Sequence, residues 1–288
     1  MSNLENKLNV LDLFSGLGGF TYGMDKTGGF ETVAFCEIDE MCSDHLKKKW
    51  PGKPVFANIE HLSYCDGVLH YEVPHSETYD QLKTDIDVIV GGYPCTGHSV
   101  AGKKDGFKDE GSKLWIEYLR LVSEIKPKYC IIENSPNLRN TGLVEMLQAF
   151  HEIGYNAEWS VISAYSVGSP HQRERLYIVL WRDDVPYCNP FRFWEADLAQ
   201  EKATSWWWPK RRIKRSAVFK KIRSFKQRIL STASGLSEQL LRLNDDHVKL
   251  IGNSLVPQIP ELIGMAIWEN ELQGSNECQN TQIPMESV

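Results

Sequence analysis

The stretch that decides the fold is DLFSGLGGF, residues 12–20. It ends a short β-rich run, and Gly16, Gly18 and Gly19 allow a tight turn and a close backbone approach to a ligand at a helix start. The next β-rich run, ETVAFCE, ends in Glu37. A carboxylate about twenty residues after a glycine-rich turn has the spacing that reaches ribose hydroxyls. Together the two segments predict a site for an adenosine-containing cofactor.

Short β-rich runs alternate with helical segments through the first part of the chain. This alternation predicts an α/β domain with a mostly parallel sheet. The expected strands are 9–14, 31–37, 53–57, 85–92, 128–134, 157–164 and 175–181, and the expected helices are 19–26, 40–49, 112–125 and one from about Pro257. We expect the polar tail after Gly274 to fray.

The composition is that of a soluble globular protein with one large domain or two smaller ones. The chain has 288 residues, of which 42% are hydrophobic and 24% charged. No run approaches the roughly 20 apolar residues that span a bilayer. The N-terminus, MSNLENKLNV, lacks the pattern of a secretory signal, so we expect a cytoplasmic protein with no membrane partner. Seven scattered cysteines without a C-x-x-C pair predict reduced thiols and no metal site.

The positive charge is concentrated in one segment. The formal net charge is −6, yet ten Lys and Arg residues and no acidic residue lie between 210 and 229. This segment predicts a surface that grips phosphates, with a solvated basic helix as the alternative. Periodicity weakens after residue 181 and apolar order returns at 247, which predicts one domain of 1–181 plus 247–288 and another of 182–246. Its Trp206–Trp208 run is expected to pack a small core, with stacking on bases as the alternative.

Three kinds of reactive side chain follow the later strands. Cys95, in GGYPCTGHS (91–99), comes just after a predicted strand, where open α/β sheets bind ligands, and its thiolate is a strong nucleophile. Glu133 ends the next strand at the same edge, and Arg173 and Arg175 lie in SPHQRERLYIV (169–179). A thiol, a carboxyl group and guanidinium groups beside an adenosine cofactor are suited to addition to an electron-poor ring.

The order of these motifs resembles the DNA cytosine-5 methyltransferases. The motifs are DLFSGLGGF, Glu37, GGYPCTGHS, ENS, QRER and GNSLVP, and the resemblance covers most of 9–181 plus 247–268. It implies a Rossmann-like catalytic core that uses S-adenosylmethionine and yields S-adenosylhomocysteine without a metal. It also implies that 182–246 is a small, irregular target-recognition domain. The residues implied to contact S-adenosylmethionine are Phe14, Leu17, Gly19, Glu37, Ile38, Asn58, Ile59, Pro94, Leu114, Asn253 and Ser254.

The resemblance also assigns the chemistry. Cys95 matches the nucleophile that attacks cytosine C6, and Glu133 matches the group at the cytosine N3 and amino edge, a role that requires a raised carboxyl pKa. Arg173 and Arg175 match the basic pair at the O2 side. C6 is unreachable inside a duplex, so the target cytosine must be flipped out.

Contacts to the DNA are expected from a loop at 102–111 and from the basic segment. The residues expected to contact DNA are Ser99, Lys103, Lys104, Lys210, Arg211, Arg212, Lys214 and Arg215. The chain departs from the family pattern at Thr96, Ser135 and His171, and at Asn58, which replaces a frequent Asp at the adenine end of the site.

Double-stranded DNA is therefore the expected partner of a monomeric enzyme. It would serve a restriction system, with a cognate restriction endonuclease, or act as a solitary, phage-borne methylase. An RNA substrate, as in the tRNA-modifying relatives, is the alternative, but Thr96 and residues 210–229 favour DNA. A DNA-binding regulator without catalysis is a third reading, which intact Cys95, Glu133 and Arg175 disfavour. A nicotinamide dehydrogenase would leave the Pro-Cys and QRER motifs without a purpose.

Overall fold

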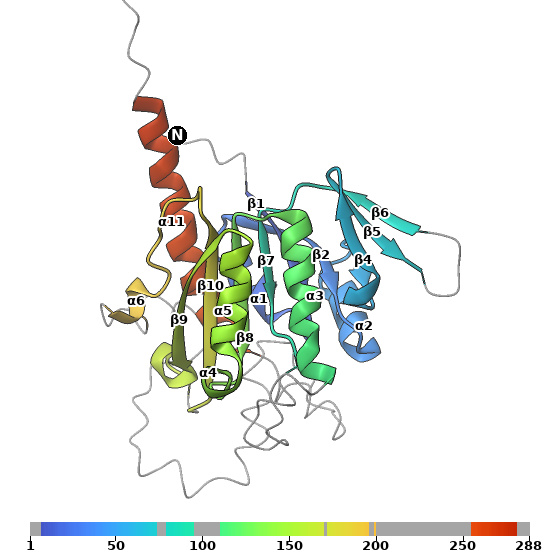
Figure 1. Cartoon of the computed structure of the whole chain (residues 1–288), viewed down its shortest axis with the longest axis horizontal. Helices are drawn as coiled ribbons and strands as arrows, with labels where there is room; N and C mark the ends of the chain where they lie inside the picture. Colours follow the sequence, from blue (N-terminus) through green and yellow to red (C-terminus); the bar gives the residue numbers. More distant parts are fainter. Residues whose placement is uncertain are drawn as a thin grey trace, which may run out of the picture.

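The computed structural model describes residues 7–73, 79–94, 110–169, 172–195, 199 and 255–280. Their main feature is a seven-stranded sheet between two layers of helices (Figure 1). Its strands, in spatial order, are β3 (Val55–Phe56), β2 (Phe30–Cys36), β1 (Leu8–Leu13), β7 (Val88–Gly91), β8 (Tyr129–Asn134), β10 (Glu174–Arg182) and β9 (Tyr155–Ser163). The helices are α1 (Gly19–Asp25), α2 (Glu40–Lys49), α3 (Glu110–Ile125), α4 (Leu138–Thr141), α5 (Leu143–Glu152), α6 (Arg192–Glu195) and α11 (Gln258–Asn280), with short turns of 3-10 helix at η1 (Ile59–His61) and η3 (Ala164–Val167).

Strand direction decides where the functional groups meet. Strands β3, β2, β1, β7 and β8 are parallel, whereas β10 is antiparallel to both of its neighbours, β8 and β9. Tyr177 of β10 therefore pairs with Glu133 of β8, close to the point where β8 ends. The carboxyl ends of the parallel strands and the beginning of β10 lie at one edge of the sheet.

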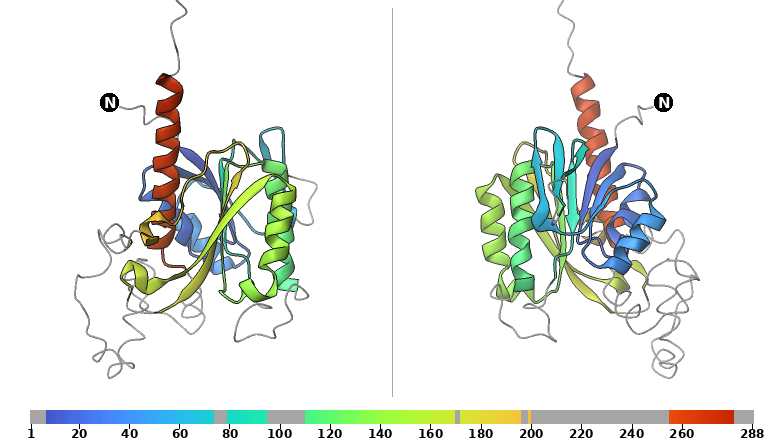
Figure 2. Two further views of the ribbon diagram at one scale, coloured as in Figure 1. Left: turned by 60° about the vertical axis from the view of Figure 1, so that its left-hand side comes forward. Right: turned by 90° about the vertical axis from the view of Figure 1, so that its right-hand side faces the viewer.

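Alternating side chains divide the core between the two faces of the sheet. On one face Val10 and Val88 pack with the apolar side chains of α1 and α11. On the other face Leu11 and Ile89 pack with those of α3 and α5. Figure 2 shows α11 on one side of the sheet and α3 with α5 on the other. Apolar residues on both faces explain the nearly continuous hydrophobic runs of these strands.

A second sheet has three antiparallel strands, β4 (Leu62–Cys65), β5 (Val68–Glu72) and β6 (Tyr79–Lys83). It packs against α3, where the backbone N–H of Tyr64 donates to Glu124 Oε2 over 2.9 Å. The β4–β5 hairpin turns at Asp66 and Gly67, whose φ angles are 51° and 77°. Two left-handed residues of the Asp-Gly type are favoured in a two-residue hairpin. This sheet was not among the expected elements.

Helix α11 packs closely across α1. A Cβ atom added at Gly23 would collide with the backbone oxygen of Pro257, and one added at Gly29 would collide with the ring of Trp268. The two glycines thus allow α11 to approach the layer that carries the glycine-rich turn. Among the described residues, no helix is long and apolar enough to cross a membrane.

The expected α/β fold with a mostly parallel sheet is confirmed, and each expected run overlaps an observed strand. The helix expected from about Pro257 extends past Gly274 to Asn280. Residues 281–288 lie outside the described residues, so the fraying of the tail stays a prediction. Helices α4 and α5 were not expected. After β10 ends, Cys188 and Phe191 are buried in the same core as α11. Most of 182–246 lies outside the described residues, so the division into two domains stays a prediction.

Candidate active site

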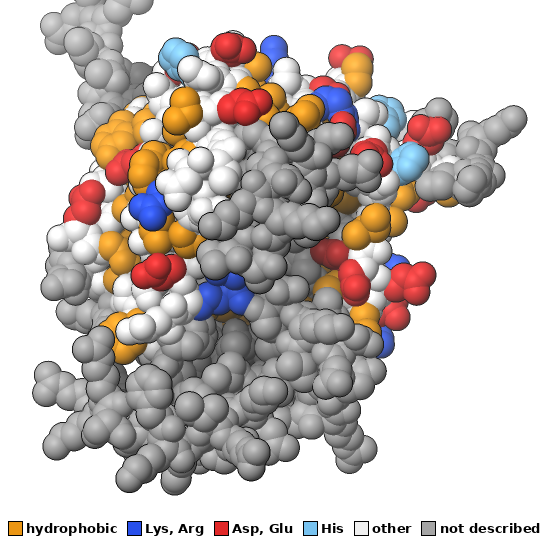
Figure 3. All heavy atoms as spheres, turned by 60° about the horizontal axis from the view of Figure 1, so that its bottom comes forward, with side chains coloured by type: hydrophobic (Ala, Val, Ile, Leu, Met, Phe, Trp, Pro, Cys, Tyr) orange, Lys and Arg blue, Asp and Glu red, His pale blue; other side chains and the backbone are white. Residues whose placement is uncertain are grey.

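A cavity of about 730 Å³ opens at the edge where β1, β2, β7 and β8 end and β10 begins. Figure 3 brings this edge of the molecule forward and shows a group of Lys or Arg side chains near its centre. One end of the cavity is lined by the glycine-rich turn and the residues after β2, and the other by Glu133, Arg173 and Arg175. The cavity therefore joins the two groups of side chains that the sequence singled out.

The glycine-rich turn has a tightly defined backbone. Phe14, Gly16 and Gly18 have φ angles of 51°, 54° and 76°, so three of five successive residues are left-handed. Ser15 Oγ donates to the backbone oxygen of Asp12 over 2.6 Å. A Cβ atom added at Gly19 would lie 2.9 Å from Leu255 Cγ. Glycine is needed at 16 and 18 for backbone conformation and at 19 for space.

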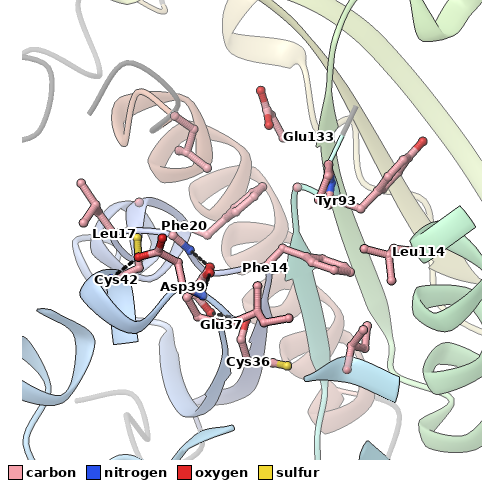
Figure 4. Close-up of a pocket in the computed structure, with 18 of the residues that line it drawn as sticks. Phe14, Leu17, Phe20, Cys36, Glu37, Asp39, Cys42, Tyr93, Leu114 and Glu133 are labelled. Carbon is pink, nitrogen blue, oxygen red and sulfur yellow. Dashed lines mark hydrogen bonds between the residues drawn. The ribbon is translucent and has the colours of Figure 1, made fainter. Parts of the chain in front are cut away.

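Glu37 connects this turn to the segment after β2 (Figure 4). Its Oε2 accepts from the backbone N–H of Gly16 over 2.6 Å, and its Oε1 accepts from that of Asp39 over 2.8 Å. Burial raises the pKa of Glu37, although both hydrogen bonds favour the charged form. Ile38, beside it on the cavity wall, leaves 73% of its surface exposed. Each Glu37 oxygen retains acceptor capacity for a ligand hydroxyl, and Ile38 offers an apolar surface to a flat ring.

At the other end of the cavity, Glu133 forms an ion pair with Arg175. Arg175 Nε lies 2.9 Å from Glu133 Oε1, and the side chains are 28% and 14% exposed. Burial raises the pKa of Glu133, while the guanidinium groups of Arg175 and Arg173 act in the opposite direction without cancelling the shift. A raised pKa makes a carboxyl group better able to share a proton with a ring nitrogen than an ordinary carboxylate is.

Gly92 and Asn134 were not among the predicted site residues. Both position the Glu133 carboxyl group or the end of its strand beside the segment that follows β7. A Cβ atom at Gly92 would lie 2.8 Å from Glu133 Oε2, so glycine leaves room for the carboxylate. Asn134 Nδ2 donates to the backbone oxygen of Tyr93 over 3.2 Å, and its Oδ1 accepts from the backbone N–H of Ser135. Asn134 thus ties the end of β8 to the segment that leads to Pro94 and Cys95. The ENS motif contained Asn134, but only the fold shows its partner.

Asp12 was also missed as a structural anchor of the site. It is fully buried, and its Oδ2 accepts from Thr21 Oγ1 over 2.7 Å and from the backbone N–H of Thr21 over 3.3 Å. Thr21 Oγ1 also lies 2.9 Å from Thr32 Oγ1. Burial raises the pKa of Asp12 to about 7, against the lowering effect of Thr21. Asp12 therefore fixes the first turn of α1 beneath the glycine-rich turn.

The structure brings many of the predicted site residues together. Those that line this cavity are Phe14, Leu17, Gly19, Glu37, Ile38, Asn58, Ile59, Pro94, Leu114, Glu133, Arg173 and Arg175. Those outside the described residues are Cys95, Ser99, Lys103, Lys104, Lys210, Arg211, Arg212, Lys214, Arg215, Asn253 and Ser254. Among the described residues, no group of three or more His, Cys, Asp or Glu side chains is arranged to hold a metal ion.

The strand order, with one antiparallel strand beside a parallel sheet, defines a Rossmann-like methyltransferase fold. Solved structures with this fold include the S. pombe Dnmt2 methyltransferase, with a TM-score of 0.62 and 15% identity over 94% of this chain and 100% of that one. A putative DNA modification methyltransferase of an E. coli prophage has a TM-score of 0.57 and 17% identity over 92% of this chain and 100% of that one.

The sequence model of the C-5 cytosine-specific DNA methylases matches residues 8–239, and the chain belongs to this family. Type II methyltransferase M.CviJI of Paramecium bursaria Chlorella virus IL3A is 34% identical over 61% of this chain and 43% of its own length. Type II methyltransferase M.Bsp6I of Bacillus sp. (strain RFL6) is 35% identical over 63% of this chain and 55% of its own length. The matches thus span about half the length of these relatives.

Proposed function

We propose that this protein transfers a methyl group from S-adenosylmethionine to C5 of cytosine in duplex DNA and releases S-adenosylhomocysteine. The observation that carries the proposal is that one cavity joins the glycine-rich turn and Glu37 to the Glu133–Arg175 pair. A methyl donor and an electron-poor ring must meet in one space protected from water. Family membership supports cytosine as the ring and DNA as the substrate.

The adenosine end of the cavity fits S-adenosylmethionine by chemistry and by size. Glu37 has acceptor capacity for ribose hydroxyls, and Ile38 has an exposed apolar surface for the adenine face. Phe14, Leu114 and Pro94 also line the cavity. When bound there, S-adenosylmethionine supplies an electrophilic methyl group. A volume of about 730 Å³ lies within the range of about 300–1,000 Å³ that small-molecule sites occupy.

At the cytosine end, Glu133 holds a proton for N3 of the ring. C5 of cytosine is a weak nucleophile, and attack at C6 pushes negative charge into the ring towards N3. A carboxyl group whose pKa is raised by burial neutralises that charge by sharing its proton. Arg175, paired with Glu133, keeps the carboxyl group oriented and offers its other N–H groups to the O2 side of the ring.

Cys95, directly after Pro94 in the sequence, is the proposed nucleophile. Its sulfur bonds to C6, and the electron pair released at C5 forms the bond to the methyl carbon as the donor's sulfur–methyl bond breaks. Loss of the C5 proton to a base then returns its electron pair to the ring and breaks the bond between C6 and the Cys95 sulfur. The enzyme is regenerated, and 5-methylcytosine remains in the DNA.

The DNA must present its cytosine outside the helix, at a cost of a few kcal/mol. We propose that residues 102–111 close over the flipped base and that the basic segment at 210–229 holds phosphates, with 182–246 as the target-recognition domain. Relatives that share about a third of their aligned residues include type II methyltransferases and an orphan methyltransferase of Bacillus phage SPR. This chain accordingly serves a restriction system beside an endonuclease or acts alone. It works as a cytoplasmic monomer.

The first experiment measures transfer of labelled methyl from S-adenosylmethionine to unmethylated genomic DNA, with RNA and Cys95→Ala protein in parallel. Base-resolution mapping of 5-methylcytosine then reports the target sequence. We expect label on DNA at one short motif and none with the Cys95→Ala protein. Label on RNA alone would show that the substrate is RNA rather than DNA. Cofactor binding without label on either nucleic acid would favour a DNA-binding protein that has lost catalysis.

A further inference from the structure

We propose that Glu60 and Asn58 together recognise the amino edge of the adenine ring. This inference rests on the proposed function, because it assumes that the cavity holds S-adenosylmethionine. It assigns a new contact to Glu60, which no motif singled out. It also gives Asn58 a defined role, as a hydrogen-bond donor rather than as an acceptor.

The two side chains form a closed pair at the cavity wall. Asn58 Oδ1 accepts from the backbone N–H of Glu60 over 3.1 Å, and Asn58 Nδ2 donates to Glu60 Oε2 over 3.1 Å. Both residues line the cavity, together with Ala57 and Ile59. The amide oxygen of Asn58 is thereby committed to the turn, and its orientation is fixed by two hydrogen bonds. One hydrogen on Asn58 Nδ2 and one oxygen of Glu60, Oε1, have no partner among the described residues.

Hydrogen bonds from a side chain of α3 anchor the main chain next to the Asn58–Glu60 pair. Arg120 Nη2 donates to the backbone oxygen of Ile59 over 3.2 Å and to that of Leu62 over 2.8 Å. Arg120 is itself held by ion pairs to Glu117 and Glu124, each at 2.8 Å. The side chain of Ile59 is buried. The Asn58–Glu60 pair is therefore presented by an anchored turn, as expected of a recognition element that must not rearrange when the ligand binds.

The position of the pair matches the purine end of the ligand. Glu37, the proposed ribose contact, follows β2, and the exposed surface of Ile38 comes next along the chain. The turn that holds Asn58 and Glu60 follows β3, the neighbour of β2 in the sheet. A ring that leaves the ribose and lies on Ile38 therefore meets the segment after β3.

The hydrogen-bonding groups are complementary to adenine. Its edge carries a 6-amino donor next to the N1 acceptor, and the protein offers a carboxylate acceptor next to an amide donor. The Glu60 carboxylate accepts from the 6-amino group, and the remaining hydrogen on Asn58 Nδ2 points to N1. A 6-oxopurine reverses both groups, placing an acceptor opposite the carboxylate and a donor opposite the amide N–H. Mismatches of this kind are strongly disfavoured because the protein's polar groups lose their partners.

The test is calorimetric titration with S-adenosylhomocysteine and with S-inosylhomocysteine, in which oxygen replaces the 6-amino group. The wild-type protein is expected to bind the adenosyl compound about 10-fold or more tightly than the inosyl compound. In Glu60→Gln the ratio should fall to within about threefold, because an amide can turn to meet either edge. The matched control is Glu72→Gln, an exposed carboxylate on β5 outside the cavity, which should keep the wild-type ratio.

Each outcome bears on a different statement. If the protein binds both compounds equally, or if Glu60→Gln keeps the full preference, the adenine contact is wrong while the proposed cofactor stands. If the wild-type protein binds neither compound, the proposed cofactor itself is wrong. Thermal melting of Glu60→Gln establishes that the variant is folded before it is titrated.

Discussion

Different kinds of groups hold the carboxylate at each end of the cavity. At the adenosine end, Glu37 is held by the backbone N–H groups of Gly16 and Asp39, and the turn's shape comes from left-handed glycines. At the cytosine end, Glu133 is held by the guanidinium group of Arg175. A site built on main-chain groups keeps its shape when one side chain changes, whereas a partly buried ion pair such as Glu133–Arg175 is lost when either partner is removed. We therefore expect substitutions at the two ends to act on different measured quantities.

The largest effect is expected from Glu133→Gln. The amide keeps the size of the side chain but cannot give a proton to the ring, so the turnover number should fall by about 10²- to 10⁴-fold. The dissociation constant of S-adenosylhomocysteine should change by about twofold or less, because the substitution is at the other end of the cavity. Methyl-transfer assays and calorimetry measure the two quantities. Equal losses in both would contradict a division between the ends.

Arg175→Ala should have the next largest effect, with the turnover number reduced by about 10- to 100-fold. Arg175 lowers the pKa of Glu133, against the dominant effect of burial. Its removal should raise that pKa further, so the protonated carboxyl group persists to higher pH. The alkaline limb of the turnover profile is expected to move to higher pH, and the pH dependence of turnover measures this shift. An unmoved limb would mean that Glu133 is not the titrating group.

Glu37→Gln is expected to act on binding instead. Loss of the charged acceptor should weaken S-adenosylhomocysteine by about 10-fold, with turnover at saturating cofactor nearly unchanged. The control is Glu40→Gln, an exposed residue of α2 that does not line the cavity. A large loss of turnover at saturating cofactor in Glu37→Gln would show that the adenosine end also positions the reacting groups.

The smallest effect is expected from Asp12, which fixes the first turn of α1 beneath the glycine-rich turn. The pKa of Asp12 is raised to about 7, well above its usual 3.8, so the folded protein keeps a proton that the unfolded chain releases. Stability from this group is therefore lost as pH rises, by about 1 kcal/mol between pH 6 and pH 8. Glu261, whose pKa burial also raises to about 7, adds a similar fall. Asp12→Asn should remove about half of this slope in urea unfolding measured at both pH values, whereas Asp44→Asn, an exposed control, should leave it unchanged.

The sequence predicted the site best where the functional residues lie at the ends of predicted strands. The glycine-rich turn, Glu37 and Glu133 each end a strand, and strand ends in a parallel sheet meet at one edge, so their convergence followed from the order of the runs. Arg175 reaches the same edge for a different reason, because β10 runs in the opposite direction. The family resemblance, rather than the run itself, indicated that Arg175 belongs to the site.

The missed features depend on partners that are distant in the chain. The role of Asp12 requires Thr21 and Thr32, and that of Asn134 requires the backbone of Tyr93. The spacing of apolar and polar residues along the sequence does not predict such long-range hydrogen bonds. The small sheet had one local signal, the Asp66-Gly67 turn, but its strands are only four or five residues long and partly polar. Their stability comes from packing on α3, which is a tertiary effect.

The close packing of α11 on α1 has a consequence for the order of synthesis. Residues from Leu255 onward supply part of the cavity wall beside Gly19 and cover the helix that begins at the glycine-rich turn. While a ribosome is still translating the preceding segment, α1 lacks its covering layer and the adenosine end lacks a wall. A nascent chain therefore carries the glycine-rich turn and Glu37 long before Leu255 and α11 are available to complete the wall of the cavity beside them.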